Sequence, residues 1–264
     1  MSDQRKSLKV LGWVLVPLVV IAAGIAWYVL DPAFRASQTV PDATAALPKD
    51  EFERRVRDFI LKNPEVIMEA ARRFEQRQRA AEEGEAVAAL TARADEILRD
   101  PDTPVGGNPE GDVTIVEFFD YNCPYCRQVS PVMVQAESDD AKLRVVYKEF
   151  PILGPNSMFA AKAALAVHRQ GKYVAFHHAL MQGKSAVDEN RVIEVASKLG
   201  IDVTRMKSDM NEAAIGAAIE KNLALAQALR INGTPGFIIG RQILRGATDL
   251  KTMKALILEA RNVQ

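Results

Sequence analysis

The chain has 264 residues, 48% of them hydrophobic, which is enough for one sizeable globular domain with additional segments. Its 34 acidic and 34 basic side chains cancel, so the sequence lacks the basic excess typical of nucleic-acid-binding proteins. The only cysteines are Cys123 and Cys126, too few by themselves to indicate a redox compartment.

The first 30 residues combine a basic start with a long apolar run. Residues 10–30 carry no charged side chain, and these 21 residues can cross the hydrocarbon core of a bilayer as a helix. The run is longer than the apolar region of a signal peptide and no small-residue cleavage site closes it, so we favour an uncleaved anchor over a cleaved signal. With the basic flank in the cytoplasm, we expect a single-pass inner-membrane protein whose catalytic domain lies in the periplasm.

Two segments separate this anchor from the rest of the chain. Residues 31–48 contain three prolines and predict a linker. Residues 49–99 are highly charged and predict a helical stalk with a break at Asn63-Pro64, because proline suits the first position of a new helix. Apolar residues recur in the stalk every three or four positions, a stripe that needs a partner surface. Two partner surfaces are possible: the chain's own domain, or the stalks of other copies of the chain. We favour a homo-oligomer, because the domain that follows the stalk looks complete without it.

Residues 104–264 predict an α/β domain with a helical insertion over about 156–228. Alternating or β-branched runs predict the strands, and alanine-rich or amphipathic runs predict the helices. The order is strand, helix, strand, helical block, two strands and a final helix, with the strands and outer helices at 114–119, 127–136, 142–150, 234–240, 242–244 and 249–261. Such an order indicates a layered sheet-and-helix architecture.

The two cysteines lie where a predicted strand turns into a predicted helix. The unpaired N–H groups and positive dipole end at the start of a helix favour a thiolate, the reactive form of cysteine. Cys126 lies one helical turn after Cys123, close enough to form a disulfide with it. A structural disulfide closing so short a loop would add little stability. The pair therefore predicts a redox dithiol.

Metal and haem alternatives lack ligands. Zinc needs about four ligands, yet the histidines are only His168 and the adjacent pair His177 and His178, which point in different directions on a helix. An iron–sulfur cluster typically needs four cysteines. A c-type haem needs histidine directly after the second cysteine, where Arg127 stands. We expect no metal.

Three segments resemble the DsbA-like thiol-disulfide oxidoreductases of the thioredoxin superfamily: VEFFDYNCPYC at 116–126, KEFPILG at 148–154 and GTPGF at 233–237. The resemblance extends from about residue 105 to the C-terminus. The anchored N-terminus and charged stalk are similar to the ScsC-like and Com1-like branch, some members of which oligomerise or isomerise disulfides. The resemblance implies a thioredoxin fold with an inserted helical domain, preceded by a transmembrane helix and a helical stalk.

The resemblance also implies roles for individual residues. Cys123 matches the exposed nucleophile and Cys126 the resolving thiol. Pro235 matches a cis-proline that faces the pair, with Thr234 before it, and this segment aligns an extended substrate peptide. Glu117 matches a buried acid that relays a proton to or from Cys126. Read without the family, Thr234-Pro235 is an ordinary turn and Glu117 a strand-edge glutamate facing solvent.

Pro124 and Tyr125, between the cysteines, are expected to tune the pair and to contact substrate. Tyr125 stands where strongly oxidising relatives often have histidine. Whether the pair preferentially oxidises or reduces its substrates is therefore left open. The resemblance implies an enzyme that forms, reduces or isomerises disulfides in exported proteins. It needs no cofactor beyond the Cys123–Cys126 disulfide. Thr234 and the stalk lean toward an isomerase or reductase.

A chain with a single cysteine pair cannot restore the redox state of that pair after turnover, so a membrane redox partner is expected. A quinone-linked partner would keep an oxidase oxidised, and a transmembrane electron donor would keep an isomerase reduced. The alternative is a non-catalytic peptide-binding or holdase protein that uses the groove beside Pro235. The presence of both thiols argues against this alternative.

Overall fold

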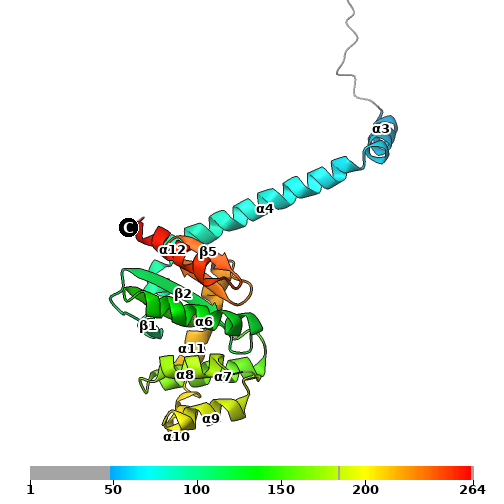
Figure 1. Ribbon diagram of the computed structural model, residues 1–264. Helices are drawn as coiled ribbons and strands as arrows, with labels where there is room; N and C mark the ends of the chain where they lie inside the picture. The colour runs from blue at the N-terminus through cyan, green and yellow to red at the C-terminus, as the bar shows by residue number, and fades with distance from the viewer. Residues whose placement is uncertain (1–47, 184, 263–264) are drawn as a thin grey trace, which may run out of the picture. The chain divides into compact units, whose positions relative to one another are not determined.

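The computed structural model describes residues 48–183 and 185–262 (Figure 1). They form two compact units, divided between Ala71 and Arg72, and each unit is described by itself. Within these residues no helix is both long and apolar enough to span a bilayer. The expected anchor at 10–30 and the linker up to residue 47 lie outside the described residues.

The predicted stalk is helical and breaks where expected. Helix α3 covers Lys49–Lys62 and α4 covers Glu65–Ala92, so Asn63-Pro64 separates them. Two acidic residues in the first turn of α3 suit the positive end of its dipole. Helix α4 continues through Gly84, at which a helix loses about 1 kcal/mol relative to alanine.

The second unit contains a five-stranded sheet in the order β1-β3-β2-β4-β5. Strands β2 and β3 are parallel, and the remaining neighbours pair antiparallel. The strands are β1 Val105–Gly107, β2 Val113–Phe119, β3 Leu143–Glu149, β4 Gly236–Ile239 and β5 Gln242–Arg245. This thioredoxin-like arrangement contains the four expected strands and one that was not predicted, β1, and it places β2, which leads to the cysteines, at the centre.

Helices cover both faces of the sheet. Helices α6 (Pro124–Asp139) and α12 (Leu250–Asn262) pack on the face formed by Ile115, Phe119 and Val145. Helices α5 (Ala94–Leu98) and α11 (Ala213–Ala228) pack on the opposite face. Successive side chains of a strand alternate between faces, so Glu117 shares the α6 face with Ile115 and Phe119.

The predicted helical insertion lies between β3 and β4. Asp188 and Asp202 cap the helices that follow them by accepting the backbone N–H of Arg191 and Arg205. The helices of the insertion are α7 Pro155–His168, α8 Tyr173–Met181, α9 Glu189–Lys198, α10 Val203–Asp209 and α11. Alanines fill most of the buried positions of α7, which lets neighbouring helices approach closely.

The C-terminal part of the predicted stalk belongs to the core of the second unit. Ile97 of α5 is only 2% exposed and packs in the cluster on the α11 face of the sheet. The amine of Lys148 on β3 is fully buried and donates to the Glu96 carbonyl and to Thr103 Oγ1, both at 2.8 Å. Burial lowers the pKa of Lys148 to about 8. Residues 94–103 thus complete the domain expected from residue 104, so the folded unit begins earlier than the sequence pattern indicates.

Candidate active site

The cysteine pair occupies the turn between β2 and α6. Cys123 is the N-cap residue of α6 with extended backbone angles, and Pro124 takes the first helical position, where its missing N–H costs no hydrogen bond. Both cysteines are free thiols. Cys126 is completely buried, and Cys123 is 4% exposed. Cys123 is therefore less open than the exposed nucleophile that the resemblance implied.

The cover over Cys123 is the segment before β4. The Thr234–Pro235 peptide bond is cis, as the resemblance implied and unlike an ordinary turn. The Cys123 thiol donates to the carbonyl of Thr234 at 3.2 Å. Pro235 is fixed in turn, because its carbonyl accepts the Gly246 N–H at 2.8 Å. The structure therefore brings Cys123, Thr234 and Pro235 together.

Two polar residues ahead of Cys123 tie the active-site turn to the helical insertion. Asp120 accepts the hydroxyl of Ser157 at 2.7 Å and the backbone N–H of Leu153 at 2.9 Å. The Asn122 amide donates to the Val187 carbonyl and its oxygen accepts the Val187 N–H. The sequence analysis missed both residues, although Asp and Asn before a helix are typical turn-forming residues.

Glu117 lies beneath the pair, so the reading of it as a solvent-facing glutamate is wrong. It is 2% exposed because β2 is the central strand and helices cover both faces of the sheet. Burial, and then the charge of Glu137, raise the pKa of Glu117 to about 8. Burial, and then the charge of Glu117, also raise the pKa of Cys126 well above that of an ordinary thiol. The two buried groups therefore influence each other's ionisation.

A second buried acid, Glu149 at the end of β3, was also missed. Its carboxylate accepts hydrogen bonds from Tyr173 at 2.6 Å and from Tyr121 at 3.2 Å, and Tyr121 also contacts His177 Nδ1. Burial raises the pKa of Glu149 and lowers that of His177 to about 3. His177 is thus a neutral core residue, and the described residues hold no group of three or more potential metal ligands.

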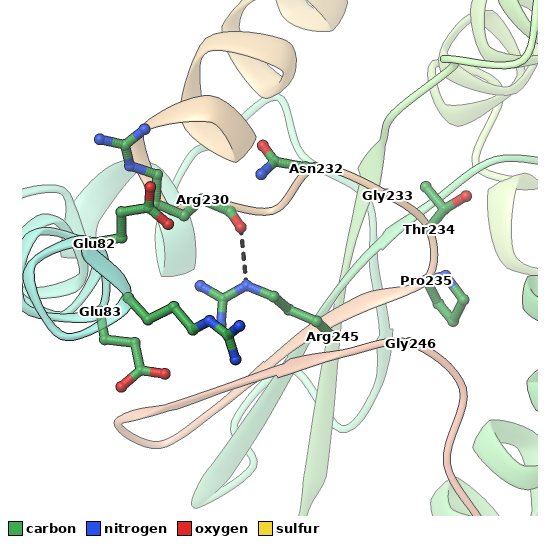
Figure 2. A pocket seen from close by; sticks show the side chains of 10 residues that line it. Glu82, Glu83, Arg230, Asn232, Gly233, Thr234, Pro235, Arg245 and Gly246 are labelled. Atoms are coloured by element: carbon green, nitrogen blue, oxygen red, sulfur yellow. Dashed lines mark hydrogen bonds between the residues drawn. The ribbon is translucent and has the colours of Figure 1, made fainter. Parts of the chain in front are cut away.

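A pocket of about 410 Å³ adjoins the cis-proline (Figure 2). One wall comes from α4, with Glu82 and Glu83, and the other from the segment that carries Thr234 and from the end of β5, with Arg245. The Arg245 guanidinium donates to the Arg230 carbonyl at 2.9 Å, the dashed line in Figure 2. This bond holds Arg230 in a left-handed backbone conformation, φ 54°, that costs a non-glycine residue about 1 kcal/mol or more.

The residues between the cysteines differ in exposure. Tyr125 is 60% exposed and presents its ring to solvent next to the pair, whereas Pro124 starts the helix.

A thioredoxin-like sheet with two thiols at a helix start, facing a cis-proline and backed by a buried acid, defines the class of thioredoxin-fold dithiol proteins.

The family follows from comparison with known proteins. Residues 114–258 match the DSBA-like thioredoxin domain, and residues 49–81 match the copper resistance protein ScsC N-terminal domain. The chain belongs to the DsbA-like family of thiol-disulfide oxidoreductases.

Solved and curated relatives agree with this assignment. A thioredoxin-like oxidoreductase from Silicibacter pomeroyi is 44% identical, with a TM-score of 0.62, and the match covers 64% of this chain and 97% of that one. Proteus mirabilis ScsC in a transitional conformation is 28% identical with a TM-score of 0.64, over 81% of this chain and 97% of that one. The thiol:disulfide interchange protein DsbA of Bordetella parapertussis is 27% identical over 60% of this chain and 81% of its own length. Other curated relatives are Na⁺/H⁺ antiporters, such as NhaA 3 of Salinispora tropica, and the match spans 25% of that protein.

Proposed function

We propose that this protein is a periplasmic thiol-disulfide oxidoreductase that forms, reduces or isomerises disulfide bonds in exported proteins through Cys123 and Cys126. One observation carries the proposal. The Cys123 thiol lies at the start of α6 against the Thr234 carbonyl, while Cys126 is buried behind it beside Glu117. A structural disulfide or a metal site needs no such division into an outer and an inner thiol.

The two thiols divide the reaction between them. In the reducing direction the sulfur of Cys123 attacks a substrate disulfide and forms a mixed disulfide, and one substrate sulfur leaves as a thiolate. Cys126 then attacks Cys123, the Cys123–Cys126 bond forms, and the second substrate thiolate leaves. The substrate gains the two electrons that the pair loses, and the proton of Cys126 passes to Glu117. The oxidising direction is the reverse, and neither needs a cofactor.

The substrate peptide is proposed to lie across Thr234 and Pro235, with Pro124 and the exposed ring of Tyr125 at its edge. The pocket beside Pro235 is large enough to take substrate side chains on that side. The same pocket suits the second candidate, a holdase that binds peptides without turnover.

The stalk supports a homo-oligomer. Phe52 and Phe59 of α3 are 55% and 56% exposed. Phe52, Val56 and Ile60 line a largely apolar groove along the helix. Burying this face between copies removes apolar surface from water. An oligomer that gathers several active sites suits a disulfide isomerase, the direction that we favour.

The location and redox supply follow from the N-terminal segment. We propose that residues 10–30 anchor the protein in the inner membrane and hold the domain in the periplasm, where disulfides persist. A membrane redox partner is then needed to restore the pair after each turnover.

Insulin reduction tests the proposed activity. With dithiothreitol as the electron donor, we expect wild-type protein to accelerate precipitation of the insulin B chain and Cys123→Ala to leave the uncatalysed rate unchanged. Equal rates for the two would favour the holdase. Refolding of scrambled ribonuclease then separates isomerase from oxidase, and the redox state of the pair in cells gives the working direction: mostly reduced for an isomerase, mostly oxidised for an oxidase.

A further inference from the structure

The buried half of the active site needs a route for protons. Cys126 is 0% exposed and Glu117 is 2% exposed, so neither group exchanges protons with bulk water directly. Thiol-disulfide exchange nevertheless adds or removes one proton at Cys126 in each cycle. Resting on the proposed function, we propose that Glu137 is the solvent-side group through which protons pass between Glu117 and water.

Glu137 lies on the helix that carries the cysteines. It follows Cys126 by eleven residues, about three turns of α6, so both side chains leave the same face of the helix. That face packs on β2 and β3, as the buried residues Val129 and Met133 show. Glu137 is only half-buried, so it borders water while Cys126 does not.

Tyr147 lies beside Glu117 in the sheet and forms a hydrogen bond with Glu137. Tyr147 on β3 is the register partner of Glu117 on β2, so the two side chains share one face of the sheet. The Tyr147 hydroxyl donates to Glu137 Oε1 at 3.1 Å. Gly106 of β1 leaves room for this hydroxyl, because a Cβ at residue 106 would lie 3.0 Å from it.

The ionisation of these groups supports the same connection. Burial and then Glu137 raise the pKa of Glu117, which shows that the two carboxyl groups lie within electrostatic range. Burial raises the pKa of Tyr147, with the charge of Glu137 as the next cause, so its hydroxyl stays protonated and remains a donor. Burial raises the pKa of Glu137 itself, and the Tyr147 hydrogen bond opposes that rise.

The other titratable groups nearby do not offer a route. Glu149 also lies within electrostatic range of Glu117, but it is 1% exposed and held by Tyr121 and Tyr173. From α8, His177 packs on the Tyr147 ring and is neutral, because burial lowers its pKa to about 3. From α12, Lys254 bonds to Asp139, so its charge is engaged by a different carboxylate.

The proton balance is simple. When Cys126 attacks the mixed disulfide in a molecule whose Glu117 is ionised, its proton moves to the Glu117 carboxylate, and the substrate leaves as a thiolate. Glu117 returns to its starting state by losing this proton through Glu137 to water. In the oxidising direction the proton travels inward by the same groups. No other oxidant or reductant enters the step.

The test isolates the attack of Cys126. The full-length reduced protein reacts with dithionitrobenzoate, which forms a mixed disulfide on Cys123, and the following attack by Cys126 releases a second coloured thionitrobenzoate. We follow this second release by stopped flow between about pH 5 and pH 9 for wild type, Glu137→Gln and Tyr147→Phe. Asp139→Asn is the matched control, because it removes a carboxylate from the same end of α6.

We expect Glu137→Gln to slow the second release by about 3- to 10-fold, less than the roughly 100- to 10,000-fold typical of a group that itself exchanges a proton with the reacting atom, because Glu137 acts through Glu117. The pH midpoint of the release should move lower, because Glu117 loses a charged neighbour. Added imidazole should restore part of the rate. Tyr147→Phe should slow the release less, and Asp139→Asn should match wild type. An unmoved midpoint and rate in Glu137→Gln would overturn the proposal, even if the variant melts at a lower temperature. A wild-type protein that never releases the second group would instead refute the proposed function.

Discussion

Replacing Glu117 with glutamine should make the protein more stable, and by an amount that depends on pH. Burial raises the pKa of Glu117 from its ordinary value of 4.5 to about 8. Between these values the folded protein holds a proton that the unfolded chain has released. Raising the pH through this window therefore destabilises the wild type. Glutamine does not ionise, so the Glu117→Gln variant escapes this loss.

The size of the effect follows from the shift. About 3.5 pKa units at 1.36 kcal/mol each correspond to roughly 5 kcal/mol above pH 8, and about 3 kcal/mol remain at pH 7. Below about pH 4 the carboxyl group is protonated in both states, and only small packing differences between the two side chains remain. The advantage of the variant should therefore be absent in acid and large at neutral pH.

Urea unfolding of the reduced proteins measures this difference. Near-ultraviolet circular dichroism is a suitable signal, because Tyr121, Tyr147 and Tyr173 are all buried in the domain. Glu110→Gln, which removes an exposed carboxylate, is the control for the change in net charge. A free-energy difference between Glu117→Gln and wild type that stays constant from about pH 4 to pH 8 would refute the buried, proton-holding role of Glu117.

Three further predictions test other parts of the molecule. Cys126→Ala should accumulate mixed disulfides between Cys123 and exported proteins, seen as thiol-sensitive bands on gels; none would be found if the roles of the two cysteines are reversed. Wild type should gain up to about 3 kcal/mol of stability between pH 8 and pH 10.5 as the buried Lys148 amine loses its proton, whereas Lys148→Met should show no such gain in urea unfolding. Phe52→Glu with Phe59→Glu should lower the molar mass measured by light scattering, whereas Arg54→Glu, about 200° around α3 from Phe52, should not.

Local patterns in the sequence were sufficient for much of the fold. The β-branched run before Cys123, the alanine-rich block and the Asn63-Pro64 break act over a few residues, and each element formed as predicted. The cis conformation at Pro235 came from the family resemblance, since spacing alone indicates an ordinary turn.

Residues whose surroundings come from distant segments were not predicted. Glu117 and Lys148 sit in strands whose alternation indicates two faces, but it does not show that helices cover both. The partners of Lys148 come from α5 and from the segment after it, and those of Glu149 come from α8 and from the turn before Cys123. No spacing in the sequence records these contacts, so the burial of Lys148 and Glu149 was not predicted, and that of Glu117 was predicted only from the family resemblance.

Asp120 and Asn122 join the active-site turn to the helical insertion. Their partners are Ser157, in α7, and Val187, between α8 and α9. Grafting only the four residues from Cys123 to Cys126 into a relative would therefore leave behind the framework that sets their geometry. Chimeras that exchange the turn and the insertion together should preserve catalytic behaviour better than motif swaps. Sequence change within the helical insertion of this protein is then a means of adjusting the chemistry of two sulfur atoms that lie outside it.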